Sequence, residues 1–192
     1  MEEFKTWFLV GFDHILNVAA LDHILFVLAL VVVYKPNMIK QIVILITAFT
    51  IGHSITLIIS ALDLITYDQK VIEFAIPLTI VLTSLNNIVN RKKEMKKAVN
   101  SNYVIALVFG LVHGLGFANY LKALLFEGNI VMELFSFNVG IEVAQLIIVF
   151  VFLFCSFLGS NYLFKKRENW VLFVSSAIFG ISLMLTLNAK FW

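Results

Sequence analysis

Four histidines and several carboxylates of this chain lie inside long apolar stretches, where ionisable side chains are costly and usually mark a functional site. Asp22 and His23 fall about midway along the first apolar stretch, and His53 lies near the middle of the second. His113 and Glu142 lie near the middle of the fourth and fifth stretches. Four segments therefore carry polar groups at a similar depth, and we expect these groups to face one another.

The chemistry available to such a group is metal coordination. Imidazole and carboxylate are ligands that suit nickel, cobalt or zinc, and no thiolate is present at this depth. Polar groups left facing hydrocarbon would each cost about a few kcal/mol or more, so convergence on one site is favoured. We predict a metal site with His23, His53, His113 and Glu142 as ligands. Asp22 is either a ligand or the partner that orients a neighbouring histidine. The simpler alternative for each residue is a hydrogen bond that serves helix packing alone.

Further polar residues accompany these candidates at helical spacing. Asn138, Glu142 and Gln145 recur at i, i+4 and i+7, so they form one stripe on a helix. Asn138 and Gln145 are predicted to lie beside the site or along a pathway to it. His14 and Glu73 lie nearer one end of their segments, where we expect them to line an outer vestibule, with His14 as a further candidate metal ligand.

Small and hydroxyl residues flank two of the histidines. Thr50 and Ser54 could hydrogen-bond the second imidazole nitrogen of His53 or a backbone carbonyl. Small residues at helical spacing let two helices approach closely, and three glycines surround His113, namely Gly110, Gly114 and Gly116. We therefore expect the backbone at His113 to lie close to a neighbouring helix.

The composition indicates that lipid surrounds most of the chain. Hydrophobic residues make up 61% of the 192 positions and charged residues 14%, with a mean hydropathy of +0.97. A span needs roughly 20 apolar residues, so the predicted fold is an all-α, polytopic membrane bundle of about six helices. It forms a single integral-membrane domain over residues 1–192. The expected spans are residues 7–34, 39–62, 71–88, 102–126, 131–158 and 170–188, of which the first is one tilted helix or a bent one.

Charge in the connections predicts the orientation. Basic residues gather in alternate loops: Lys35 and Lys40; Arg91, Lys92, Lys93, Lys96 and Lys97; Lys165, Lys166 and Arg167. The other connections carry Asp63, Asp68, Lys70, Glu127 and Glu133. Because positive loops remain in the cytoplasm, both termini are predicted to be periplasmic. The modest net charge of +2 and the membrane composition make nucleic acid an unlikely class of partner.

Four ordered segments resemble the signature segments of the HupE/UreJ family of hydrogenase and urease accessory membrane proteins. They are GFDHILNVAALDHILFVLAL, AFTIGHSITL, FGLVHGLGFA and FNVGIEVAQL. The resemblance implies a nickel permease or secondary transporter of the bacterial inner membrane, with Asp22, His23, His53, His113 and Glu142 on the metal path. It also implies metalloenzyme maturation proteins as partners, beside the metal ion and the lipid bilayer. Nickel is the metal expected from the family, and the residues themselves suit cobalt or zinc equally well.

Two other functions fit the same residues. Three histidines and an acid could hold zinc in an intramembrane hydrolase or other membrane enzyme, where a metal-bound water attacks the substrate. The chain could also be an accessory or scaffold subunit whose polar cluster serves assembly. A permease must open its site to both sides of the membrane, whereas an enzyme keeps a fixed open coordination position, and the sequence distinguishes neither.

Overall fold

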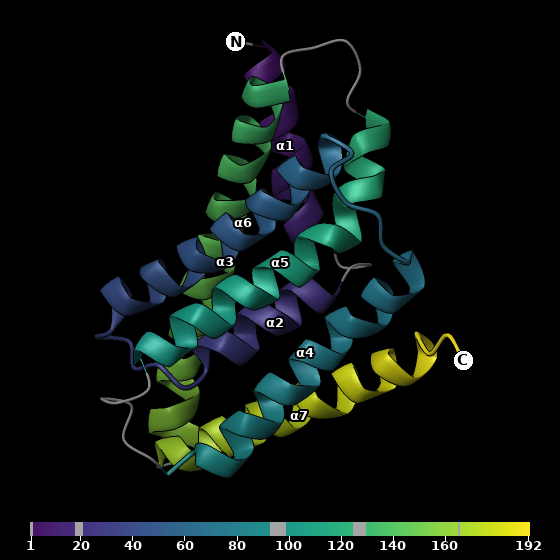
Figure 1. Cartoon of the computed structure of the whole chain (residues 1–192). Coiled ribbons are helices and arrows are strands. Elements are labelled where there is room, and N and C mark those ends of the chain that lie inside the picture. Colours follow the sequence, from purple (N-terminus) through teal and green to yellow (C-terminus); the bar gives the residue numbers. More distant parts are fainter. Residues whose placement is uncertain (1, 18–20, 93–98, 125–129, 165) are drawn as a thin grey trace.

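The computed structural model describes residues 2–17, 21–92, 99–124, 130–164 and 166–192, and within them every regular element is a helix (Figure 1). The elements are α1 (Glu2–Leu16), α2 (Leu21–Val31), α3 (Ile39–Ala61), α4 (Gln69–Asn90), α5 (Val99–Leu124), α6 (Ile130–Leu158), the π-helical turn η2 (Gly159–Leu163) and α7 (Arg167–Asn188). The chain is therefore the polytopic helical bundle that its composition predicts.

Five of these helices, α3 to α7, are long and apolar enough to cross a membrane by themselves. Their bounds lie within a few residues of the predicted spans, and residues 125–126 of the fourth prediction lie outside the described residues. The first predicted span is divided into α1 and α2, whose axes differ in direction by 73°. Of the two alternatives, the bent one is correct, and the pair supplies a sixth span if it is counted as one.

The first turn of α2 carries a polar side chain that bonds to its own backbone. Asp22 stands in the first turn of α2, and its Oδ1 atom accepts a hydrogen bond from the backbone nitrogen of His23 at 2.9 Å. That bond satisfies one of the amide groups that a helix start leaves without a partner. The first turn of α2 therefore places two ionisable side chains, Asp22 and His23, within the bundle.

The helices pack chiefly as three pairs, which are α3 with α5, α1 with α6, and α4 with α7. In the first pair, a Cβ added at Gly52 would overlap the carbonyl oxygen of Leu107, and one at Gly110 would overlap that of Phe49. Gly114 faces the carbonyl of His53 in the same way. This is the close approach beside His113 that the glycine spacing predicted, and van der Waals contact of this kind drives helix association in lipid.

The pair α1 and α6 is built in the same manner. Gly11 lies against the carbonyl of Phe137, and Gly140 lies against the carbonyl of Phe8. A larger residue at either position would force the two backbones apart. Each of these two helix pairs is therefore closely packed along its own length, and the polar residues described below lie where the pairs meet.

The connections that the structure describes lie at two ends of the bundle. In Figure 1 the α2–α3 and α6–α7 connections lie toward the lower left, and both termini and the α3–α4 connection lie toward the top and right. Which end faces the cytoplasm stays a prediction. Part of the charge on which it depends lies outside the described residues, namely Lys93, Lys96, Lys97, Lys165 and Glu127.

Candidate metal centre

Three histidines from three helices converge inside the bundle. His14 comes from the last turn of α1, His23 from the first turn of α2 and His53 from the middle of α3. Each offers one ring nitrogen, and these three nitrogens all lie within 4.8 Å of one another. The ring centroids of His14 and His23 are 4.5 Å apart, and that of His53 lies 6.1 Å from His14 and 6.2 Å from His23. A single ion placed between them could contact all three.

The fourth histidine lies next to this group. The ring centroid of His113, on α5, lies 5.6 Å from that of His23. Its Nδ1 atom donates a hydrogen bond to the carbonyl oxygen of Phe109 at 2.9 Å, so Nε2 carries the lone pair. The rings of Phe26 and Phe49 pack against it at 4.7 and 5.3 Å. His113 is therefore held in one tautomer with a free ligand atom.

Asp22 fixes the tautomer of His23 in a comparable way. Its Oδ1 atom lies 3.1 Å from Nδ1 of His23, and Nε2 of His23 has no hydrogen-bond partner. A carboxylate that accepts from one imidazole nitrogen leaves the lone pair on the other and raises its basicity. Of the two roles predicted for Asp22, this geometry favours the orienting one.

Several other imidazole nitrogens of the four histidines are buried and lack a hydrogen-bond partner. Nε2 of His14, Nε2 of His113 and both ring nitrogens of His53 have no hydrogen-bond partner. His53 and His113 are wholly buried and His23 nearly so, whereas His14 is partly exposed. A buried polar group without a partner costs about 1–3 kcal/mol. A cation with affinity for neutral imidazole would satisfy several of these atoms at once, so the residues present fit a transition-metal ion.

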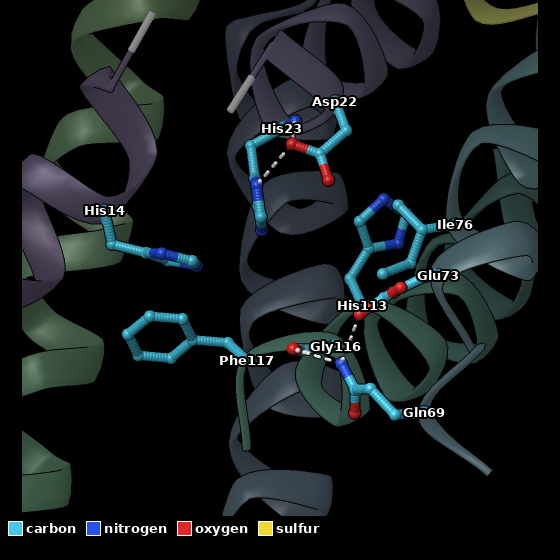
Figure 2. Close-up of a pocket in the computed structure, with 9 residues that line it drawn as sticks. All are labelled: His14, Asp22, His23, Gln69, Glu73, Ile76, His113, Gly116 and Phe117. Carbon is cyan, nitrogen blue, oxygen red and sulfur yellow. Dashed lines mark hydrogen bonds and ion pairs between the residues drawn. The ribbon is translucent and has the colours of Figure 1, made fainter. Parts of the chain in front are cut away.

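A cavity of about 220 Å³ opens onto this group. Figure 2 shows His14 and His23 turned toward the same space, with His113 at its back and Glu73 and Gln69 on the side of α4. His53 does not line the cavity. The volume is large enough for an ion that still carries water molecules, since one water occupies about 30 Å³ of liquid.

A polar network borders the cavity between α4 and α5. Nε2 of Gln69 donates to the carbonyl of Gly116 at 3.2 Å and to Oε1 of Glu73 at 3.3 Å. Nδ2 of Asn119 donates to Oε1 of Gln69 at 3.0 Å, and the Tyr67 hydroxyl donates to the carbonyl of Leu115 at 3.0 Å. Glu73 and His14 thus line one cavity. Gln69 and Asn119 were not among the predicted residues, although the i, i+4 spacing of Gln69 and Glu73 was a usable signal.

Phe117, like Ile76, is a further lining residue that the sequence did not single out. Its ring centroid lies 3.8 Å from that of His14 and 5.2 Å from that of Phe137. The imidazole of His14 thus packs against two aromatic rings, since its centroid also lies 5.9 Å from that of Phe137 on α6. No spacing rule distinguishes this phenylalanine from the other 18 of the chain's 19.

Glu142 lies outside the group of three histidines that could share one ion. Thr47 donates to its Oε1 atom at 2.6 Å, and the Thr50 hydroxyl contacts its Oε2 atom. The same hydroxyl lies 3.0 Å from Oε1 of Gln145. Among the described residues, the group able to share one ion consists of His14, His23 and His53. Glu142 and Gln145 form a separate cluster with α3.

The other flanking residues bond to backbone. Ser54 donates to the carbonyl of Thr50 at 2.7 Å, and Asn138 donates through Nδ2 to the carbonyl of Leu134 at 2.7 Å. Of the two partners predicted for Thr50 and Ser54, the backbone carbonyl is the one found, because Thr50 also reaches the carbonyl of Ile46 at 3.2 Å. Neither hydroxyl contacts the imidazole of His53.

A family model described as HupE / UreJ protein matches residues 1–190 of the chain. No curated protein and no solved structure matches it.

Proposed function

Since the chain belongs to the HupE/UreJ family, we propose that it is a permease or secondary transporter of a divalent transition metal, nickel in the first place. The observation that carries this proposal is the convergence of ring nitrogens of His14, His23 and His53 from three helices to within 4.8 Å. His113 stands next to them with its Nε2 atom free. Partners among metalloenzyme maturation proteins follow from the family alone and remain part of the proposal.

The donor set suits transport because it is neutral. A carrier must bind its ion tightly enough to capture it and weakly enough to release it. Imidazole suits nickel, copper and zinc, and the proposed ligands include no thiolate and no directly coordinating carboxylate. Asp22 supplies the nearest negative charge and acts through His23. Such a site binds a cation with lower affinity than a set of thiolate ligands would.

The division of the first span into α1 and α2 also supports a transport function. In transporters, discontinuous helices build ion sites within the membrane, since their ends present partial charges to the ion. His14 occupies the last turn of α1, where the helix dipole is negative and stabilises a cation. The ligands also belong to different helix pairs, with His14 on α1 and His53 on α3. Relative movement of the pairs would change the distance between ligands and thereby release the ion.

Metal binding and uptake test the proposal directly. The purified protein is titrated calorimetrically with Ni²⁺, Co²⁺ and Zn²⁺, and uptake is measured in proteoliposomes. We expect a reversible site that His53→Ala and His113→Ala each weaken by at least about tenfold. Ser182→Ala is the matched control, because Ser182 is a buried hydroxyl on α7 that bonds its own helix at Phe179.

Each alternative function predicts a different result. A stoichiometric zinc ion that survives dialysis, without uptake into vesicles, would replace the permease with a membrane metalloenzyme. Absence of binding for all three metals in a folded wild-type protein would leave the histidines a packing role and favour a scaffold subunit. Uptake in both histidine variants at the wild-type rate would remove the histidines from the transport path.

A further inference from the structure

A second polar cluster joins α3 to α6, apart from the histidines. It consists of Glu142 and Gln145 on α6 and of Thr47 and Thr50 on α3, with the hydrogen bonds given above. Glu142 is the thirteenth of the 29 residues of α6 and so lies near the middle of the span. An intramembrane carboxyl group is costly and usually serves ion or proton movement. The cluster therefore calls for a function of its own.

The charge of Glu142 has no fixed counter-charge among the described residues. The ion pairs found there are Asp22 with His23 and Lys122 with Asp63. Titratable side chains on the elements that pack against α6 are Glu2, Glu3, Lys5, Asp13 and His14 on α1, Asp22 and His23 on α2, Lys40 and His53 on α3, and Tyr162 on η2. None of them forms an ion pair with Glu142. Its partners are two neutral hydroxyl groups, which stabilise a carboxylate less than a cation would.

The donors and acceptors of the cluster can form a complete set of hydrogen bonds whether Glu142 is protonated or ionised. A threonine hydroxyl has a single proton, yet the Thr50 hydroxyl lies beside both Oε2 of Glu142 and Oε1 of Gln145. If Glu142 is protonated, it donates to Thr50, and Thr50 donates to Gln145. If Glu142 is ionised, the amide of Gln145 turns over, its Nε2 group donates to Thr50, and Thr50 donates to the carboxylate. Nε2 of Gln145, a fully buried residue, has no partner in the present arrangement.

The cluster connects the two halves of the proposed metal site. Thr50 precedes His53 by three residues, about one helical turn, on α3. Glu142 follows Gly140, whose backbone contacts α1, the helix of His14. The pair α3 and α5 carries His53 and His113, and the pair α1 and α6 carries His14. The bonds of Glu142 to Thr47 and Thr50 thus join the pair that carries His14 to the pair that carries His53 and His113.

We propose that Glu142 is a proton-binding site that couples proton movement to metal transport, an inference that builds on the transport function proposed above. A hydronium ion on one side of the membrane transfers one proton to Oε2 of Glu142, so that one O–H bond of hydronium breaks, the O–H bond of the carboxylic acid forms and water is left. On the other side that O–H bond breaks as the proton passes to a water molecule, which becomes hydronium, and the carboxylate is restored. Ionised and neutral Glu142 differ in the strength of the α3–α6 hydrogen bonds, since bonds to charged groups are about twice as strong. Protonation therefore loosens the junction between the helix pairs and moves His14 relative to His53.

The experiment is metal uptake into proteoliposomes with and without an imposed pH gradient, with a trapped pH-sensitive dye. We expect wild-type uptake to depend on the gradient and to move protons. Glu142→Gln should lose both the gradient dependence and the metal-driven proton flux, while its calorimetric metal affinity stays at the wild-type value. Thr50→Val, which removes the connecting hydroxyl at constant shape, should shift the pH at which uptake is half-maximal.

Several outcomes would overturn the proposal while leaving the permease intact. Gradient-dependent uptake in Glu142→Gln equal to that of the wild type would show that the proton binds elsewhere. Loss of metal affinity in the folded Glu142→Gln variant would make Glu142 a metal ligand instead. If Glu142→Gln does not fold, Glu142→Asp keeps a titratable group and must retain coupling with a shifted pH profile. Wild-type protein that neither binds nor moves metal would contradict the proposed function itself.

Discussion

Oδ1 of Asp22 lies 2.9 Å from the backbone nitrogen of His23 and 3.1 Å from Nδ1 of the same residue. One carboxylate oxygen therefore accepts a backbone hydrogen bond in the first turn of α2 and orients the imidazole that faces the metal site. The same atom contributes to the local fold and to the chemistry, and the two contributions can be separated by substitution.

Asp22→Asn is expected to weaken metal binding about 10- to 100-fold, the usual effect of removing the carboxylate behind a histidine ligand. Thermal stability should change little, because the Oδ1 atom of asparagine can accept the same hydrogen bond from the backbone nitrogen of His23. Calorimetry and thermal unfolding of the same preparation provide the two readings. Unchanged affinity in this variant would show that Asp22 does not tune His23.

Gly110→Ala should destabilise the bundle by roughly 1–3 kcal/mol, because the new methyl group overlaps the carbonyl oxygen of Phe49. Gly180→Ala on α7 is the matched control, since a Cβ there meets nothing within 4 Å. That control should be neutral or stabilising by up to about 1 kcal/mol, as alanine is the better helix former. Unfolding in mixed micelles measures both, and equal stabilities would contradict the close α3–α5 contact.

Glu73→Gln should slow metal capture without changing the affinity of the histidines by a comparable factor. Glu73 is exposed at the cavity that leads to His14, and a negative charge at the entrance of a cleft raises the association rate of a cation. The difference between variant and wild type should shrink at high ionic strength. Stopped-flow metal binding tests this, with Glu168→Gln in the first turn of α7 as a control carboxylate. A rate effect that is independent of salt would argue against electrostatic steering.

The predicted orientation can be tested by cysteine labelling in a Cys155→Ser background. Leu64→Cys and Asn37→Cys place exposed thiols in the α3–α4 and α2–α3 connections. If both termini are periplasmic, a membrane-impermeant maleimide should label position 64 in cells with a permeabilised outer membrane. Position 37 should react only after the inner membrane is opened. The reverse pattern would place both termini in the cytoplasm and reverse the side of the membrane toward which the cavity opens.

Much of the architecture follows from local composition. The apolar lengths between polar connections predict α3 to α7 to within a few residues, because the requirement to cross a hydrocarbon layer acts on each segment separately. The polar residues inside spans were also identifiable one by one, since an ionisable side chain such as His23 or His113 within an apolar stretch can be recognised from the sequence of that stretch alone. The glycines around His113 predicted a close contact, although they did not identify α3 as the partner.

Only the tertiary structure decided which of these groups meet. His14, expected in an outer vestibule as a further candidate ligand, lies within the group of His23 and His53, and its helix α1 is bent by 73° from α2. Glu142, at a similar depth to the histidines, instead contacts Thr47 and Thr50. Depth along a span is encoded locally by hydropathy. The rotation of each helix about its axis and the angle at which helices cross depend on contacts such as Gly140 with Phe8, between residues far apart in the chain.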